Sequence, residues 1–450
     1  MAACVVGTAN AILAQRFVFN KILSPEVSEM GITESTTGLV LSRRDSLRAL
    51  GLAAGVSGLS SIVQGAPWKA SVSADGAADW KNIASQFYID PEIAYLNTGS
   101  LGSIPRPVLE AMQAVNLTLE RNPVQQGFGP VLADTEAVRP KIADLLGCKT
   151  EEVVVTRNTT DGINQVAEGL NMQPGQRVLT SNHEHGGGLG AWRYLVKRRG
   201  VFLDVAELGA PPASEDEVVE KFKAAIRPET KVIMCSHVTF SSGVLVPIAR
   251  LSELAHQHGC LLVVDGAQGP GGVPVDVKAL GCDAYASSGH KYLLGPKGTG
   301  LLYINENVKD QITPFVLDDG YGVYTAIRGT SNWTETIGLG KSLDFVKNIG
   351  REAVANRLMD IRNQLYEVVS KTPGTKIFSA PPGNSMASHL VCFSVTDRAK
   401  HPLLNEQFAK DKVVVKTVGI EGIDYRLSCH LYNTEKDVTR FAESLHKVLG

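Results

Sequence analysis

The sequence of 450 residues lacks several features that would define its class at once. It has no strongly apolar run of about 18 residues, so no transmembrane helix is predicted. It has no CxxC motif, and its seven cysteines are odd in number and widely spaced, so we expect neither a disulfide framework nor a bound metal. The net charge of −2 gives no reason to expect nucleic acid or an anionic membrane as a partner.

The composition is that of an ordinary globular protein. Apolar residues make up 44% of the chain and charged residues 20%, which argues against disorder over the whole length. The 44 glycines follow no collagen period, so they predict tight turns and close backbone approaches.

Residues 1–78 are interpreted as a leader and linker. The segment SRRDSLR at 42–48 resembles the twin-arginine export motif, apart from a serine where phenylalanine is usual. A charge-free stretch at 49–68 follows, and small residues at 72–74 or 64–66 offer a cleavage site. We therefore expect export of the folded protein to the periplasm. The alternative is a cytoplasmic protein whose arginine pair is accidental.

From about Asp79 the chain alternates short apolar segments with helical patterns. Strands are expected at 153–156, 177–181, 201–208, 231–238, 260–265, 284–288 and 299–304. Helices are expected at 162–167, capped by Thr160 and Asp161, and at 191–199, 214–226 and 248–258. This alternation predicts βαβ units and a mostly parallel sheet.

The pattern changes after about Thr336. A long charged helical stretch reaches Lys371, and Asn433 or Thr434 caps a final helix. Short strands are expected near 376, 389–395, 413–417 and 425–428. We therefore predict a large domain at 105–335 and a smaller α+β domain at 336–450, with 79–104 as an N-terminal segment that packs on the small domain.

Two residues at strand ends indicate the chemistry. Asp265 ends an apolar run, where a carboxylate is costly unless it meets a cation. Lys291 follows the strand at 284–286 by a few residues, between apolar residues and glycine turns that favour desolvation and a nucleophilic amine. The spacing of 26 residues (291 − 265) between two strand ends suits pyridoxal 5'-phosphate. The lysine would bind its aldehyde as a Schiff base, and the aspartate would keep its ring nitrogen protonated.

Several segments in order resemble the class V aminotransferases of fold type I, a family that includes cysteine desulfurases and isopenicillin N epimerases. They are YLNTGSLG at 95–102, RNTTDG at 157–162, DGAQ at 265–268, SGHK at 288–291 and RLSCHLYN at 426–433. The resemblance implies an α/β fold with a mostly parallel seven-stranded sheet in the large domain, pyridoxal phosphate as cofactor and an amino-acid substrate.

The resemblance also implies a set of phosphate ligands. Thr159 and Thr160 would lie at a helix N-terminus, where backbone N–H groups favour an anion. Ser288 and His290 would add further donors. Thr330 resembles the residue that reaches the phosphate from a second subunit, which implies a homodimer with shared sites.

Other residues would bind the ring and the substrate. His185 resembles the residue that stacks on the cofactor ring, with His183 as the alternative. Gln268 would hydrogen-bond the phenolic oxygen, and Arg426 would bind the substrate α-carboxylate. Asn97 would be a further substrate-binding residue. The catalytic residues implied by the resemblance are Lys291, Asp265 and His185. The structural alternatives are an N-cap for Asp265, a surface loop for His185, a turn for Thr330 and a structural carboxylate partner for Arg426.

Two departures from the family pattern reduce the number of possible reactions. Desulfurases carry a catalytic cysteine on a loop shortly before the carboxylate-binding arginine, but the segment 413–420 has none and Cys429 follows Arg426. Phe240 stands where desulfurases have asparagine, as in isopenicillin N epimerase-like proteins. We therefore expect an epimerase or racemase. A C–S lyase or an aminotransferase is the alternative, because all three begin with removal of the Cα proton by Lys291.

The motifs disfavour two functions from other classes. A non-catalytic pyridoxal phosphate-binding protein would not need Lys291, Asp265 and Arg426 together. A nucleotide-binding protein would need a phosphate loop, and the spacing of Gly295, Gly298 and Gly300 fits neither a dinucleotide fingerprint nor a Walker A loop.

Overall fold

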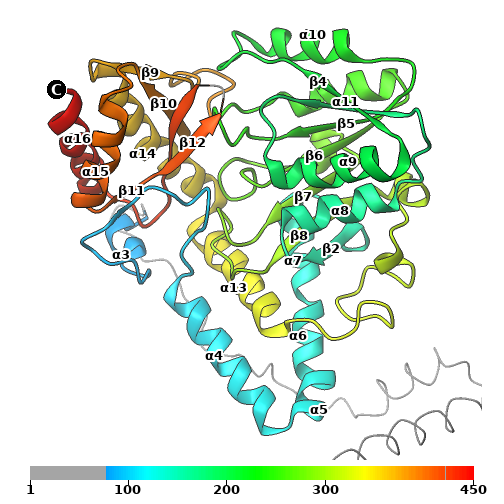
Figure 1. The fold of residues 1–450 in the computed structure, drawn as a ribbon. Helices are drawn as coiled ribbons and strands as arrows, with labels where there is room; N and C mark the ends of the chain where they lie inside the picture. The colour runs from blue at the N-terminus through cyan, green and yellow to red at the C-terminus, as the bar shows by residue number, and fades with distance from the viewer. Residues whose placement is uncertain (1–77, 421) are drawn as a thin grey trace, which may run out of the picture. The chain divides into compact units, whose positions relative to one another are not determined.

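The computed structural model describes residues 78–420 and 422–450 (Figure 1). The segment that resembles a twin-arginine motif and its candidate cleavage sites lie outside the described residues. Within the described part, no helix has both the length and the apolar character needed to cross a membrane.

A seven-stranded sheet forms the centre of the larger domain, in the order β2-β8-β7-β6-β5-β3-β4 (Figure 1). Only β8 runs antiparallel to its neighbours, β2 and β7. The other strand pairs are parallel. The strands are β2 (Val153–Thr156), β3 (Arg177–Ser181), β4 (Phe202–Ala206), β5 (Thr230–Ser236), β6 (Leu261–Asp265), β7 (Ala284–Ser288) and β8 (Gly300–Ile304). This mostly parallel sheet, with a smaller C-terminal domain, confirms the predicted fold class.

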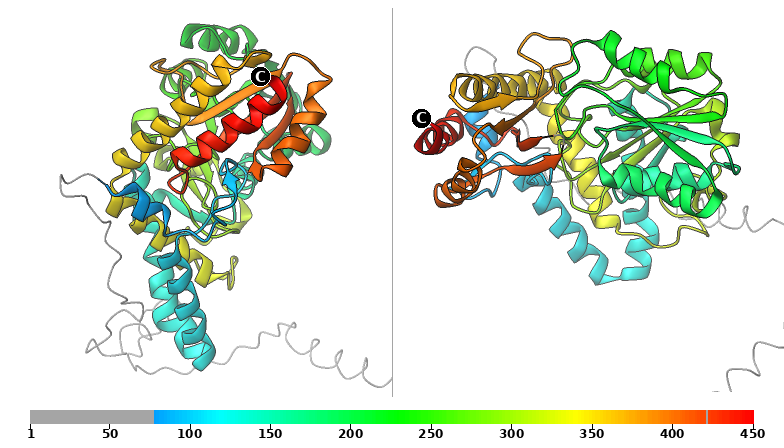
Figure 2. Two further views of the ribbon diagram at one scale, coloured as in Figure 1. Left: turned by 90° about the vertical axis from the view of Figure 1, so that its left-hand side faces the viewer. Right: turned by 45° about the horizontal axis from the view of Figure 1, so that its top comes forward.

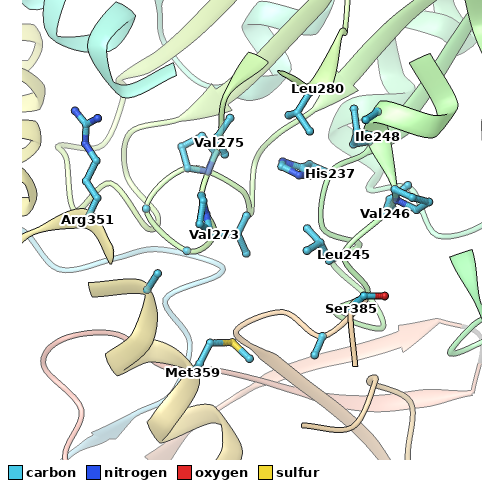
Figure 3. A pocket seen from close by; sticks show the side chains of 18 of the residues that line it. His237, Leu245, Val246, Ile248, Val273, Val275, Leu280, Arg351, Met359 and Ser385 are labelled. Atoms are coloured by element: carbon cyan, nitrogen blue, oxygen red, sulfur yellow. The ribbon is translucent and has the colours of Figure 1, made fainter. Parts of the chain in front are cut away.

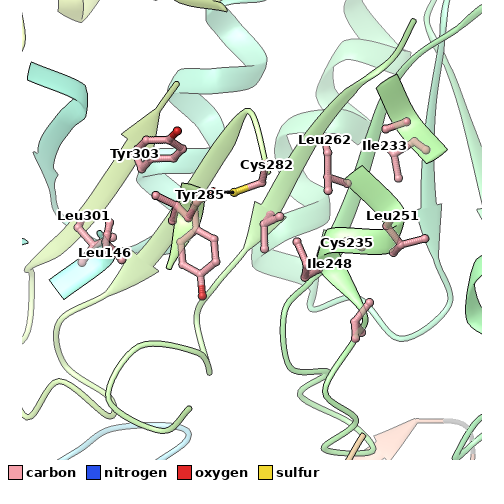
Figure 4. Packing of buried hydrophobic residues seen from close by; sticks show 14 of the residues in the cluster. Leu146, Ile233, Cys235, Ile248, Leu251, Leu262, Cys282, Tyr285, Leu301 and Tyr303 are labelled. Atoms are coloured by element: carbon pink, nitrogen blue, oxygen red, sulfur yellow. Dashed lines mark hydrogen bonds between the residues drawn. The ribbon is translucent and has the colours of Figure 1, made fainter. Parts of the chain in front are cut away.

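Helices cover both faces of this sheet (Figure 2, right). Because side chains alternate along a strand, Leu262 and Val264 of β6 face one helical layer and Val263 faces the other. The first layer contains α7 (Val138–Leu146), α10 (Glu215–Ala225), α11 (Ile248–Gln257) and α13 (Trp333–Ile349). The second contains α8 (Thr159–Gly169) and α9 (Gly186–Arg199). Figure 4 shows the packing of Leu262 and Tyr285 in the first cluster.

The smaller domain is built on a four-stranded antiparallel sheet in the order β12-β13-β10-β9. Its strands are β9 (Thr375–Ile377), β10 (Leu390–Val395), β12 (Lys416–Ile420) and β13 (Ile423–Ser428). Its helices α14 (Arg351–Lys371), α15 (Lys400–Lys410) and α16 (Glu435–Leu449) pack on this sheet around Phe393, Tyr425 and Phe441. Thr434 is the N-cap of α16.

The segment before the large domain joins the smaller one. After α3 (Trp80–Ala84), strand β1 (Ala94–Tyr95) pairs in parallel with β11 (Val413–Val414). The chain then forms the helices α4 (Arg106–Arg121), α5 (Pro123–Gln126) and α6 (Leu132–Glu136), which the sequence patterns did not indicate, and the short α12 (Val277–Leu280) lies further on.

Two predicted elements of the C-terminal part were wrong. The helical stretch from Thr336 to Lys371 is two helices, because Gly350 adopts φ +100° between α13 and α14. The predicted strand 413–417 is divided after Val414: β11 pairs with β1, whereas β12 pairs with β13 in another sheet. An apolar run does not reveal that its two halves pair with different strands.

The buried centre of the large sheet offers a test of stability. Leu262 in β6 is 0% exposed, whereas Leu403 on α15 is 53% exposed. We expect Leu262→Ala to lower the free energy of unfolding by about 2–5 kcal/mol, because it leaves a cavity. The control Leu403→Ala changes it by about 0.5 kcal/mol or less. Urea denaturation followed by circular dichroism measures both, and equal losses would contradict the packing described.

Candidate active site

A pocket of about 610 Å³ lies at the carboxyl ends of the large-domain strands. This is where ligands of α/β sheets bind. Among the residues that line it are most of those predicted for the site: Thr159, Thr160, His185, Asp265, Gln268, Ser288, His290, Lys291 and Arg426. They come from the ends of β2, β3, β6 and β7 and from β13 of the small domain.

The end of β2 and the end of β7 form a cradle for an anion. Helix α8 begins at Thr159, and its N-cap is Asn158, whose Oδ1 accepts a hydrogen bond from Asp161 N at 2.9 Å. The predicted cap, Thr160 and Asp161, was therefore wrong, because both lie inside the helix. Thr159 N donates to Ser288 Oγ at 3.0 Å, and the two hydroxyl oxygens lie 2.7 Å apart. Helix N–H groups with adjacent hydroxyls suit a phosphate.

His290 lies at the same cradle. Its Nδ1 is buried and has no hydrogen-bond partner. Burial, together with the charges of Lys291 and Lys297, lowers the pKa of the imidazole to about 4. A neutral ring with an unused nitrogen fits an additional ligand atom at this position.

Lys291 and Asp265 determine the electrostatics of the pocket. Asp265, 4% exposed at the end of β6, accepts a hydrogen bond from Ala267 N at 2.9 Å. Burial raises the pKa of this carboxyl, and the charge of Lys291 opposes the rise. Burial also lowers the pKa of Lys291 to about 8; Asp265 opposes this shift and Arg426 adds to it. Part of the amine is therefore neutral, and nucleophilic, near physiological pH.

The structure separates the two histidines proposed for ring stacking. His185 caps α9, accepts a hydrogen bond from Gly187 N at 3.0 Å and lines the pocket. Its ring packs edge-on against Phe240, with 4.9 Å between centroids. His183 is 1% exposed and bonds instead with Ser241 Oγ at 2.9 Å. His185 is thus the histidine that can face a ligand in the pocket.

Arg426 carries hydrogen-bonding capacity that the protein leaves unused. It is 2% exposed, and its guanidinium donates only long hydrogen bonds of 3.3 Å, to Phe240 O and to Ser100 Oγ. Its Nε has no partner, and no carboxylate among the described residues pairs with it. Burying an unpaired guanidinium is expensive, so this site is suited to a carboxylate from outside the protein.

Gln268 lies beside this arginine. Its Nε2 donates to Gly99 O at 2.9 Å, and its Oε1 is buried without a partner. A Cβ on Gly99 would lie 2.8 Å from Gln268 Oε1 and 2.9 Å from Arg426 Nη2. A larger residue at this position would displace the end of one of these two side chains.

Two predicted site residues lie outside the pocket lining. Thr330 is exposed in the loop before α13. Its role from a second subunit stays a prediction, as does the shared-site dimer. Asn97 forms a β-bridge with Ser428, while Gly99 and Ser100 line the pocket in its place. The Asn97 Oδ1 is buried and has no hydrogen-bond partner, so its role in substrate binding stays a prediction.

The pocket also includes residues that were not predicted for the site. Arg157 and Asp161 form an ion pair of 2.8 Å at its edge. Asn164 lies on α8, and Lys416 comes from β12 of the small domain. Lys416 belongs to the segment 413–420, for which the motifs indicated the lack of a cysteine but no site residue. Its place opposite Arg426 could have been inferred only from the register of the two strands.

A second cavity, of about 950 Å³, lies elsewhere in the described part of the chain (Figure 3). Apolar side chains such as Val273, Leu245 and Ile248 surround it, with Met359 from α14. Its His237 is bonded to the Tyr285 hydroxyl at 2.9 Å, and burial lowers the pKa of this imidazole to about 4. The cavity contains neither Lys291 nor Arg426, so the chemistry belongs to the smaller pocket.

The model of the family described as aminotransferase class V matches residues 94–441. The chain belongs to this family. Isopenicillin N epimerase from Amycolatopsis lactamdurans is 32% identical over 403 residues, which cover 83% of this chain and 99% of that protein. The chain is therefore an enzyme of the pyridoxal phosphate-dependent type.

Solved structures agree with this fold. A cysteine desulfurase from Thermococcus onnurineus NA1 is 25% identical, with a TM-score of 0.72 over 82% of this chain and 98% of that chain. A variant of C-DES with glycine covalently linked to its pyridoxal phosphate cofactor is 22% identical, with a TM-score of 0.74 over 81% of this chain and 99% of that chain. The unpartnered His290 Nδ1 and Gln268 Oε1, beside the α8 cradle, fit such a cofactor in this pocket.

The electrostatics of Lys291 predict its reactivity. With a pKa of about 8, about half of its amine is neutral at pH 8, whereas an exposed lysine titrates near about 10.4. Competitive acetylation of the cofactor-free protein, followed by mass spectrometry, measures this midpoint. We expect Asp265→Asn to move it to lower pH, because a carboxylate stabilises the ammonium, and Arg426→Met to move it to higher pH. A midpoint near that of the exposed Lys410 in all three proteins would contradict this arrangement.

Proposed function

We propose that this protein is an amino-acid epimerase or racemase that acts at the substrate Cα. The observation that supports this is the composition of the pocket: Lys291 beside Asp265, a buried Arg426 without a carboxylate, and no cysteine among the described lining residues. The similarity to isopenicillin N epimerase over nearly the whole of that protein supports the same reaction type.

Different side chains of the pocket would bind the substrate and remove its Cα proton. Arg426 binds the substrate α-carboxylate through its unused N–H groups and thereby orients Cα. Lys291, whose amine is easily deprotonated, removes the Cα proton from one side. Pyridoxal phosphate, when bound, supplies an electron-accepting ring for the charge left on Cα. Asp265 would supply the counter-charge for the ring nitrogen, and His185, which also lines the pocket, would pack against the ring.

The described cysteines do not provide desulfurase chemistry. None of the six lines the pocket. Cys392, the ladder partner of Arg426 on β10, is fully buried, and burial raises the pKa of its thiol to about 12. A thiol of this kind stays protonated and is a poor nucleophile. Of the segment 413–420, in which a desulfurase would be expected to carry its catalytic cysteine, Lys416 is the residue that lines the pocket.

Exchange at Cα tests the proposal. The full-length, cofactor-loaded protein is incubated with a panel of L-amino acids in deuterium oxide, and NMR and chiral chromatography follow the products. We expect D-isomers that carry deuterium at Cα. Lys291→Ala should lose the visible absorption of the bound cofactor and at least about 100-fold of the exchange rate, because the base is removed.

Lys410→Ala is the matched control, since this lysine is exposed on α15 and does not line the pocket. It should retain absorption and exchange. Keto acids as the main product would show an aminotransferase instead of an epimerase. Sulfide released from cysteine substrates would show a C–S lyase. Identical absorption in wild type and Lys291→Ala would refute the role of Lys291 itself.

A further inference from the structure

Lys416 is placed beside Arg426 by the register of the small-domain sheet. It is the first residue of β12, the edge strand that reaches toward the large domain (Figure 1). Lys416 and Arg426 are directly opposed in the antiparallel pair β12–β13. Directly opposed residues have Cα atoms about 4.5–5.5 Å apart and side chains on the same face of the sheet. Both side chains line the pocket.

Lys416 is a cation of the pocket that no described residue pairs with and that the proposed reaction does not use. Arg157 is paired with Asp161 at 2.8 Å. The Lys291 ammonium is stabilised by the charge of Asp265, and Arg426 is the proposed ligand of the substrate α-carboxylate. The Lys416 ammonium has neither a hydrogen bond nor an ion pair in the described part of the chain, and the residue is exposed. Its charge acts on the pocket, since it contributes to the lowered pKa of His185.

Lys416 does not belong to the cradle that suits the phosphate. The cradle is formed by large-domain groups, from α8 and the end of β7. Lys416 comes from the small domain, on the same strand pair as the arginine that faces the substrate. A second cation next to the carboxylate-binding arginine is suited to a second anionic group of the same molecule.

We propose that Lys416 binds an anionic group on the substrate side chain, so that the substrate class is an amino acid with a second, distal carboxylate or comparable acid. The inference rests on the proposed function, because it takes Arg426 as the ligand of the α-carboxylate. Arg426, buried, fixes the reacting end of the substrate, and Lys416, exposed at the mouth of the pocket, selects the charge of the other end.

Simple dicarboxylates test this without depending on turnover, because they have no amine. Isothermal titration calorimetry on the full-length, cofactor-loaded protein compares succinate, glutarate, adipate and pimelate, each with its own monoamide. Both members of a pair offer Arg426 one carboxylate, but only the diacid offers a second charge. We expect at least one diacid to bind about ten-fold more tightly than its monoamide, as for a hydrogen bond between charged groups. The preference should shrink as salt is added.

Lys416→Met should remove this preference and leave the affinity for the monoamides unchanged. Lys410→Met is the matched control, because it removes an exposed positive charge from α15, outside the pocket, and should keep the preference. Arg426→Met should weaken both members of each pair alike. Circular dichroism and Tm of each variant establish that the fold is intact.

The inference is overturned if no diacid is preferred by the wild type, or if the preference survives in Lys416→Met. Failure of the proposed function is visible separately, in the Cα exchange and in the absorption of the Lys291→Ala variant. If the protein shows normal exchange without a preference for diacids, the proposed reaction stands and the proposed binding of a second anionic group is wrong.

Discussion

The structure depends on holding an amine and a carboxylate together where neither is well solvated. Burial raises the pKa of Asp265 and lowers the pKa of Lys291, and the charge of each residue opposes the shift of the other. The parallel strands β6 and β7 make this possible, because their carboxyl ends lie side by side with Asp265 opposite Ala286. Space is also needed: a Cβ on Gly188 would lie 2.7 Å from Asp265 Oδ2. The large sheet is thus the frame that keeps one lysine reactive.

The second requirement is a cation brought from the small domain. Arg426 lies on β13, and its guanidinium is left with long hydrogen bonds to Phe240 O and Ser100 Oγ. Two sheets must therefore meet around one ligand, with the N-terminal segment running between them at Gly99. The pairing of β1 with β11 and the bridge of Asn97 to Ser428 anchor that segment to the small domain. Residues far apart in the sequence are joined here by backbone pairing.

Much of the pocket could be predicted because it obeys a local rule. Asp265, Ser288 and Thr159 each lie at or just after the end of a short apolar strand, and parallel strands place these ends at one edge. The details that failed are those that depend on partners. Asn158, not Thr160, caps α8, because its Oδ1 accepts the hydrogen bond from Asp161 N. The run 413–417 could not be divided, because the residue types along it do not show that Val413 and Val414 pair with β1 whereas Lys416 and Thr417 pair with β13.

Local periodicity and short motifs are enough to predict the alternation of strands and helices, the family and the chemical groups at the strand ends. The three-dimensional packing is needed to show which of His183 and His185 faces the pocket, that Asn97 does not line it, and that Lys416 lies opposite Arg426. The physical reason is that side-chain direction and strand register depend on non-local hydrogen bonds, and a shift of one residue reverses the face on which a side chain lies.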